Sequence, residues 1–119
     1  MSKQIAISVT KSNGSDSLVD QRFGRAFGFL IINADTKEIV TFVKNNSVDA
    51  AHGAGTGAAA LMAANNVATI ISGRFGPKAH QALAQMKIEM MMAKEGTTVT
   101  EALDKLESGD LEKMELKVY

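Results

Sequence analysis

The sequence predicts an α/β fold with a mixed five-stranded sheet flanked by helices. Three observations predict it: short apolar, β-branched runs of strand length, alanine-rich or capped segments between them, and a continuous apolar run in the middle of the chain. With 119 residues, of which 45% are hydrophobic and 22% charged, we expect a single domain over residues 1–119.

The first half of the chain has the pattern of a strand followed by a hairpin. Residues 4–9 form an apolar run, and residues 27–32 and 39–43 form two more, separated by the turn-like stretch 33–37. A long loop joins the first strand to this hairpin.

The second half alternates helices with strands. Thr56 to Asn66 is an alanine-rich helix pattern, and residues 67–72 form the continuous apolar run that is typical of a strand buried on both faces. Pro77 suits the first position of a helix through Met86. Residues 88–92 then supply a fifth strand, along which three successive methionines must alternate between faces and cannot converge on copper.

The chain closes with a third helix and an acidic tail. Thr98 and Glu101 have the spacing of a capping box, which predicts a helix from Thr98 to Leu106. The tail, residues 107–119, is acidic and then alternating: Met114, Leu116 and Val118 could add a last edge strand, or the tail could be mobile.

Connection types then predict the topology. A hairpin gives antiparallel pairing and helical crossovers give parallel pairing, so the strands, numbered along the chain, should take the order 3-2-1-4-5. One edge of this sheet collects the ends of strands one, three, four and five and the start of strand two. We call this edge the rim, where open α/β sheets usually bind ligands.

Composition excludes several classes of function. Thirteen basic and thirteen acidic residues cancel, so we expect no nucleic-acid or membrane partner. No apolar run has the length of a membrane span or the features of a signal peptide, which makes a cytoplasmic location the expectation. The absence of cysteine excludes disulfides, thiolate zinc sites and clusters held by protein thiolates.

Arginine marks the rim as a candidate anion site. Arg25 lies between Gly24 and the first apolar residues of a strand, where its guanidinium could be fixed and offer several donors to an oxyanion or sulfido anion. The alternative is a surface arginine stacked on Phe23 or Phe27. The charges expected on the rim are Lys11, Arg22, Arg25, Lys44, Arg74, Lys78 and Lys94 against Asp16, Asp20, Asp49 and Glu95.

Two glycine-rich turns also point to an anion. Backbone N–H groups and a positive helix end are expected at Gly53, Gly55, Thr56 and Gly57, which we place in a loop ahead of the first helix, and at Gly76 before the second. The stretch matches neither the Walker nor the dinucleotide pattern, and a simple turn requirement is the alternative. His52 could donate to the anion or ligate a metal, whereas His80 is the weaker candidate.

Catalytic patterns are missing. No pair of acids ends the central strands, as a two-metal nuclease would need, and no serine has the setting of a nucleophile elbow. Binding is therefore expected rather than catalysis.

Taken together, the motifs resemble the dinitrogenase iron–molybdenum cofactor biosynthesis family, the NifX-like domains. They are Phe23-Gly24-Arg25-Ala26, His52-Gly53-Ala54-Gly55, Gly76-Pro77-Lys78-Ala79 and the segment from Gly96-Thr97-Thr98 to Leu103. The resemblance covers nearly the whole chain. Where many relatives carry histidine before the Phe-Gly-Arg motif, this chain has Gln21-Arg22, so metal ligation is not expected at that point.

The resemblance implies a ribonuclease-H-like domain without nuclease activity. Such a domain would carry a preformed anionic metal–sulfur cluster of the iron–molybdenum or molybdenum–copper type, held by charge and hydrogen bonds. Its partners would be cluster-assembly or molybdenum enzymes. Two alternatives stay open: a sensor of a phosphorylated metabolite or nucleotide, and a protein-interaction module that docks through its acidic tail.

Overall fold

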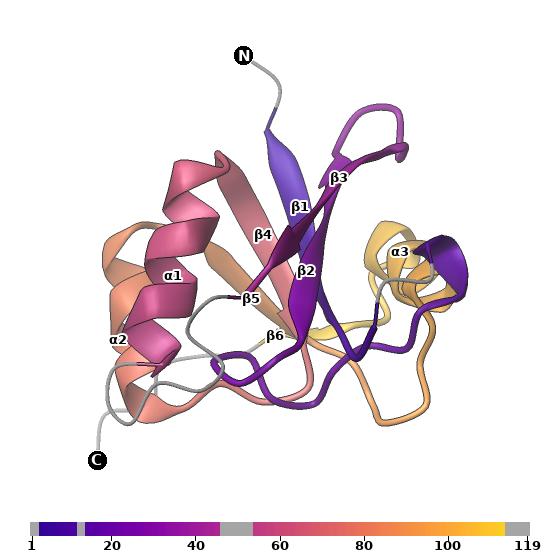
Figure 1. The fold of residues 1–119 in the computed structure, drawn as a ribbon. Helices are drawn as coiled ribbons and strands as arrows, with labels where there is room; N and C mark the ends of the chain where they lie inside the picture. The colour runs from indigo at the N-terminus through magenta and orange to yellow at the C-terminus, as the bar shows by residue number, and fades with distance from the viewer. Residues whose placement is uncertain (1–2, 12–13, 46–53, 114–119) are drawn as a thin grey trace.

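The computed structural model describes residues 3–11, 14–45 and 54–113. Its sheet has the predicted pairing (Figure 1). β1 (Gln4–Val9) pairs antiparallel with β2 (Gly28–Asn33), and β2 pairs antiparallel with β3 (Ile39–Lys44). On its other side, β1 pairs parallel with β4 (Val67–Ser72), which pairs parallel with β5 (Glu89–Met92). The order 3-2-1-4-5 is thus confirmed.

Part of the tail forms a sixth strand. β6 (Glu112–Lys113) pairs antiparallel with β5 and extends the order to β3-β2-β1-β4-β5-β6. The expectation of an edge strand was placed further along the tail, and residues 114–119 lie outside the described residues.

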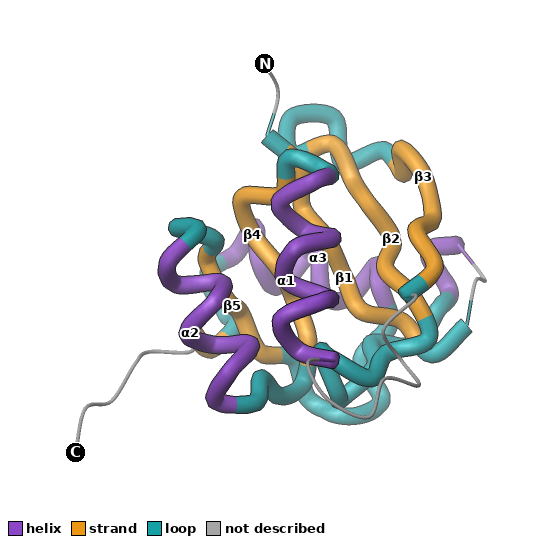
Figure 2. Tube along the Cα trace, turned by 60° about the vertical axis from the view of Figure 1, so that its left-hand side comes forward, coloured by secondary structure: helices purple, strands orange, loops and turns teal. Residues whose placement is uncertain are grey.

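Helices cover both faces of the sheet (Figure 2). α1 (Ala54–Ala64) and α2 (Pro77–Gln85) lie on one face and α3 (Val99–Ser108) on the other, beside the short 3-10 turn η1 (Gly14–Asp16) of the β1–β2 connection. In the described part of the chain, no helix is both long and apolar enough to span a bilayer.

Strand alternation divides the core into two layers. Phe29 and Ile70 pack with Met62 of α1 and Leu83 of α2, whereas Ile7, Ile71 and other residues of the opposite face pack against Val99 and Ala102 of α3. Each fully buried aliphatic side chain of this kind contributes about 1.5–3 kcal/mol. The sheet is therefore held between helices on both sides.

The caps of α2 and α3 follow the sequence. Pro77 begins α2, and the Glu101 N–H donates to Thr98 Oγ1 at 3.2 Å while the Thr98 N–H donates to the Glu101 carboxylate at 3.2 Å. A helix that continued through Met86 would turn this side chain toward the sheet. Instead α2 ends at Gln85, Met86 is its C-cap, and Met86 is 41% exposed. Met90 and Met91 face opposite core layers, as expected from alternation.

Candidate anion-binding site at the rim

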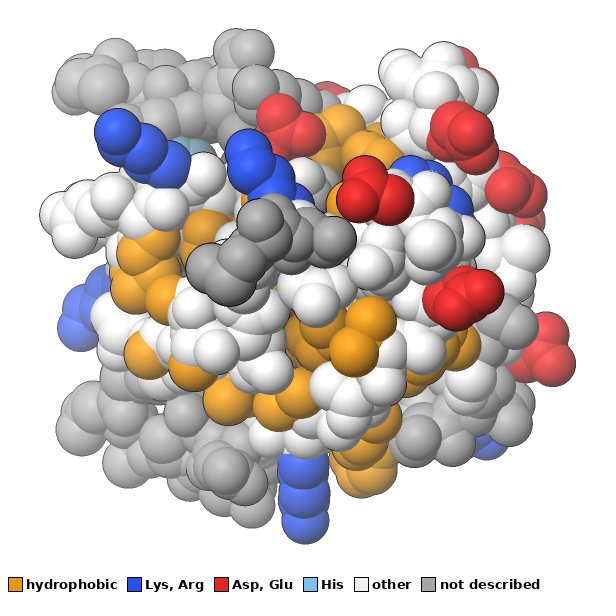
Figure 3. All heavy atoms as spheres, turned by 90° about the horizontal axis from the view of Figure 1, so that it is seen from above, with side chains coloured by type: hydrophobic (Ala, Val, Ile, Leu, Met, Phe, Trp, Pro, Cys, Tyr) orange, Lys and Arg blue, Asp and Glu red, His pale blue; other side chains and the backbone are white. Residues whose placement is uncertain are grey.

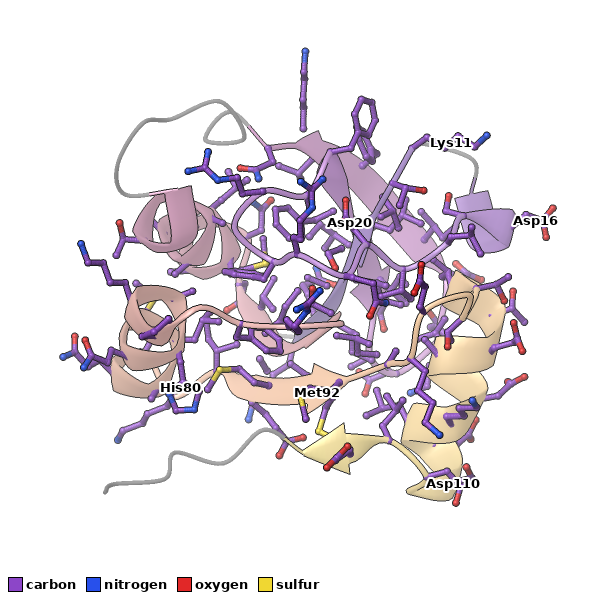
Figure 4. All side chains as sticks on the ribbon, turned by 90° about the horizontal axis from the view of Figure 1, so that it is seen from below. Lys11, Asp16, Asp20, His80, Met92 and Asp110 are labelled. Atoms are coloured by element: carbon purple, nitrogen blue, oxygen red, sulfur yellow. The ribbon has the colours of Figure 1, made fainter. Side chains whose placement is uncertain are left out.

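The rim forms as the topology predicts, and Figure 4 views the molecule from this end. Asp20 lies near the middle of the view, while Lys11 and Asp16 lie toward one side, by η1 (Figure 4). Of the charges assigned to the rim, these two are therefore peripheral. Asp49 lies outside the described residues.

The segment around Asp20 lies between the C-terminal ends of β1 and β4. The Asp20 N–H donates to Ser8 O at 2.7 Å, and the Gly73 N–H donates to Asp20 O at 3.3 Å. The hydroxyls of Ser8 and Ser72 are 2.7 Å apart and lie 2.8 and 3.1 Å from that same carbonyl oxygen. This buried network fixes the segment, so a ligand at the rim would contact its outer surface rather than enter the sheet.

Arg22 and Arg74 meet on that outer surface. They face each other across a parallel bridge, and the Phe23 N–H donates to Arg74 O at 3.1 Å. The Asp20 carboxylate accepts the Arg22 backbone N–H at 3.0 Å and lies 3.7 Å from Arg22 Nε. Arg74 forms no ion pair with any described residue. Of the two facing arginines, only Arg22 thus has an acidic partner among the described residues, and the Asp20 side chain is only 7% exposed.

A rigid turn carries Arg25. The Phe23 ring is buried against Phe29 and Phe75, with ring centroids 5.5 and 5.3 Å apart. Fully buried Asn45 donates from its side-chain amide to Gly24 O at 3.0 Å and to Ala26 O at 2.9 Å, so it brackets Arg25. Phe23 is only 1% exposed, so its ring offers almost no free surface on which Arg25 could stack.

The two helices of the same face begin next to each other at the rim. A Cβ on Gly55 would lie 2.9 Å from the Ala79 Cβ, so the first turns of α1 and α2 touch. The helix expected from Thr56 begins two residues earlier, because α1 starts at Ala54, and the glycine-rich stretch expected as a loop has Gly55 in the first turn of this helix. The close contact between helices explains the need for glycine at Gly55.

Gly76 is different. It is the N-cap of α2, with a φ of −67° and no side-chain cap, and no atom of the described residues lies within 4 Å of the place where a Cβ would be. The protein's own conformation therefore does not require glycine there. His52 and Gly53, the other candidates of this region, lie outside the described residues.

The described residues offer no ready metal site. They contain no group of three His, Asp or Glu side chains suited to a metal ion, and the whole sequence has no cysteine. His80 is buried, its Nε2 has no hydrogen-bond partner within the described chain, and it lies at the side of α2, away from Asp20 (Figure 4). It is therefore not part of the arginine site.

A group of acidic residues lies away from the rim. They lie on and after α3, and in Figure 3, which views the end opposite the rim, red side chains cluster on one side of the molecule. The exposed acids of this region are Glu101, Asp104, Glu107, Asp110 and Glu112.

Sequence reasoning missed the residues that support the arginines. Asn45 directly follows a strand and looks like an ordinary turn residue, and Ser8 and Ser72 look like strand residues with no special role. The Gln21 side chain passes close to Gly73, and its Nε2 donates to Ala93 O at 3.4 Å. No local pattern marks these residues, because each has its partners far away in the sequence.

Comparisons with known proteins agree with this architecture. The sequence profile of the family described as dinitrogenase iron–molybdenum cofactor matches residues 3–109. The apo form of the orange protein from Desulfovibrio gigas is 36% identical with a TM-score of 0.88, over 96% of this chain and 94% of that one. A Thermotoga protein described as a NifB protein of the DUF35 family is 26% identical with a TM-score of 0.82, over 100% and 98%.

A curated relative supports the same assignment. An uncharacterised protein of Methanocaldococcus jannaschii is 34% identical over 95 residues, which are 78% of this chain and 80% of the relative. The profile match spans all of the core elements described above, from β1 to α3. The chain therefore belongs to the dinitrogenase iron–molybdenum cofactor family.

Proposed function

We propose that this protein is a non-enzymatic carrier or scaffold for a preformed anionic metal–sulfur cluster. The observation that carries the proposal is the pairing of Arg22 with Arg74. Like charges on facing residues repel each other, and among the described residues only Arg22 has an acidic partner, the buried Asp20 carboxylate. An anion bound between the two guanidinium groups would remove this repulsion.

The donor set fits a cargo that is already assembled. Without thiols, the chain offers N–H donors and positive charge in place of metal–sulfur bonds. Guanidinium groups donate several hydrogen bonds in a fixed geometry, and the first N–H groups of a helix lack partners within the helix. Both kinds of donor are present at this rim, where α1 and α2 begin side by side.

Family membership narrows the choice of cargo. The family name points to the iron–molybdenum cofactor or its precursors. A molybdenum–copper sulfide has the same features of negative charge and exposed sulfide, and it would use the same donors. Cluster-assembly and molybdenum enzymes are the partners that such a carrier would serve, in the cytoplasm, where no transport across a membrane is needed.

Anaerobic loading tests the proposal. The protein is mixed with iron–molybdenum cofactor, or with tetrathiomolybdate and copper, and then desalted. Metal and visible absorbance should travel with the protein at low ionic strength and should be lost as salt is raised, because the contacts are electrostatic. Absence of metal from the protein fraction at low salt would refute the carrier function.

A nucleotide or phosphorylated metabolite is the second candidate. Phe27 is 43% exposed and stacks on Phe42 with centroids 5.7 Å apart, so an aromatic platform follows Arg25 in the chain. An aromatic ring beside a cation suits a base and its phosphate. A thermal-shift screen separates the two candidates, because a ligand that binds only the folded state raises the melting temperature.

A further inference from the structure

Asp20 is a buried residue that is held in one place at the arginine site. Its backbone N–H donates to Ser8 O at 2.7 Å, and its carbonyl oxygen accepts the Gly73 N–H at 3.3 Å. The hydroxyls of Ser8 and Ser72, both fully buried, lie 2.8 and 3.1 Å from the same carbonyl oxygen. The backbone of Asp20 therefore cannot move without breaking these hydrogen bonds to the ends of β1 and β4.

The Asp20 side chain turns toward Arg22. Its Oδ1 accepts the Arg22 backbone N–H at 3.0 Å and lies 3.7 Å from Arg22 Nε. Accepting the N–H of the residue two positions ahead is the ordinary role of an Asx turn, which asparagine performs as well as aspartate. The negative charge is therefore more than this turn requires.

The carboxylate lies on the inner side of the site. The Asp20 side chain is 7% exposed, whereas that of Arg22 is 65% exposed. An anion that binds to the Arg22 guanidinium from outside would thus have a fixed negative charge behind that arginine. Two like charges about 6 Å apart repel enough to lower affinity about tenfold, at a dielectric between those of water and of a protein surface.

We propose that Asp20 limits the affinity of the arginine site, so that the carrier can release its cargo. This inference rests on the carrier function proposed above. Arg22, Arg74 and Asp20 together carry one net positive charge, since there are two arginines and one aspartate. A site with both arginines and no carboxylate would hold a multiply charged anion more tightly and release it more slowly.

Asp20→Asn tests this role, because the amide oxygen can still accept the Arg22 N–H while the charge is lost. In anaerobic equilibrium dialysis with tetrathiomolybdate and copper, this variant should bind about tenfold more tightly than the parent protein. Release of molybdenum into excess buffer should slow by a similar factor. Asp20→Ser keeps a hydroxyl acceptor without charge and should give a similar gain. It decides the question if thermal melts show that Asp20→Asn is not folded.

Asp16→Asn is the matched control. Asp16 is exposed and lies toward one side of the rim, so the same loss of charge there should raise affinity less than Asp20→Asn does (Figure 4). The double variant Asp20→Asn, Arg74→Gln should bind less tightly than Asp20→Asn, because it returns to one net positive charge.

The outcomes separate this inference from the carrier function. If the parent protein binds the cargo and neither neutral variant at position 20 binds it more tightly, Asp20 does not limit affinity, whereas the carrier function stands. A gain that Asp16→Asn matches, or that the double variant keeps in full, would also overturn the inference. If none of these proteins retains molybdenum at low salt, the carrier function fails and this inference fails with it.

Discussion

Arg22 and Arg74 lie opposite each other across a parallel bridge, although β2, β3, α1 and β4 separate them along the chain. The pair forms because the chain after β1 returns over the end of β4 and hydrogen-bonds there. Tertiary structure therefore brings two positive charges together at this point. Their repulsion opposes folding, whereas an anionic ligand would need them.

Arg74→Gln should have opposite effects on stability and on binding. Without ligand at low salt, the variant should gain about 0.2–1 kcal/mol in free energy of unfolding, because a like-charge pair is removed. Its affinity for an anionic cluster should fall about tenfold, as expected for loss of a charged hydrogen bond. Urea denaturation and equilibrium dialysis measure the two effects. Lys11→Gln, at the side of the rim, is the control. It should change the free energy of unfolding and the cluster affinity less than Arg74→Gln does.

Asn45→Ala should destabilise the protein and loosen the turn of Arg25. It removes two hydrogen bonds and leaves the carbonyls of Gly24 and Ala26 without the amide donor, at a cost of about 2–4 kcal/mol. Asn65→Ala, which removes a single bond to Leu61 O at 2.8 Å, should cost less. Chemical denaturation compares them, and equal losses would contradict the role of Asn45 as a clamp.

Two glycine substitutions near the site should behave differently. A Cβ at Gly73 would lie 2.6 Å from Gln21 Cα, which is backbone and cannot move aside cheaply, so Gly73→Ala should cost about 1–3 kcal/mol. The methyl group of Gly76→Ala would meet no atom of the described residues within 4 Å, and the stability of this variant should change by less than about 1 kcal/mol.

Gly76→Ala also separates an effect on ligand binding from an effect on folding. If a ligand approaches the backbone at the start of α2, Gly76→Ala should lower cluster affinity while leaving the melting temperature nearly unchanged. Dialysis and thermal melts on one preparation give both values. An unchanged affinity would remove Gly76 from the site.

The capping box of α3 predicts an acid-sensitive contribution to stability. Hydrogen bonds from the Thr98 backbone N–H and hydroxyl to the carboxylate lower the pKa of Glu101 below its ordinary value of 4.5. A group whose pKa is lowered by folding stabilises the fold above its unfolded pKa, and this contribution is lost as the pH falls through the folded pKa. Between pH 7 and about pH 3, the melting temperature of Glu101→Gln should fall less than that of the parent protein. Identical pH profiles would contradict this role.

Much of the fold could be predicted because its signals are local. The strand at residues 67–72, the proline at the start of α2 and the capping box of α3 each depend on neighbours within one turn or one strand. The start of α1 was misplaced because alternating glycines favour a loop, whereas the contact between Gly55 and Ala79 favours a helix there.

The sequence by itself determined the strand order, the absence of thiol chemistry and the presence of arginine near the sheet's edge. Tertiary structure alone decided that Arg22 faces Arg74 and that Asn45 brackets Arg25. It also decided that Lys11 and Asp16 lie toward one side of the rim. The physical reason is that hydrophobic periodicity and helix caps are encoded by adjacent residues. Hydrogen bonds and charge contacts between distant loops depend on how the chain crosses the ends of its strands, which no short stretch of sequence records.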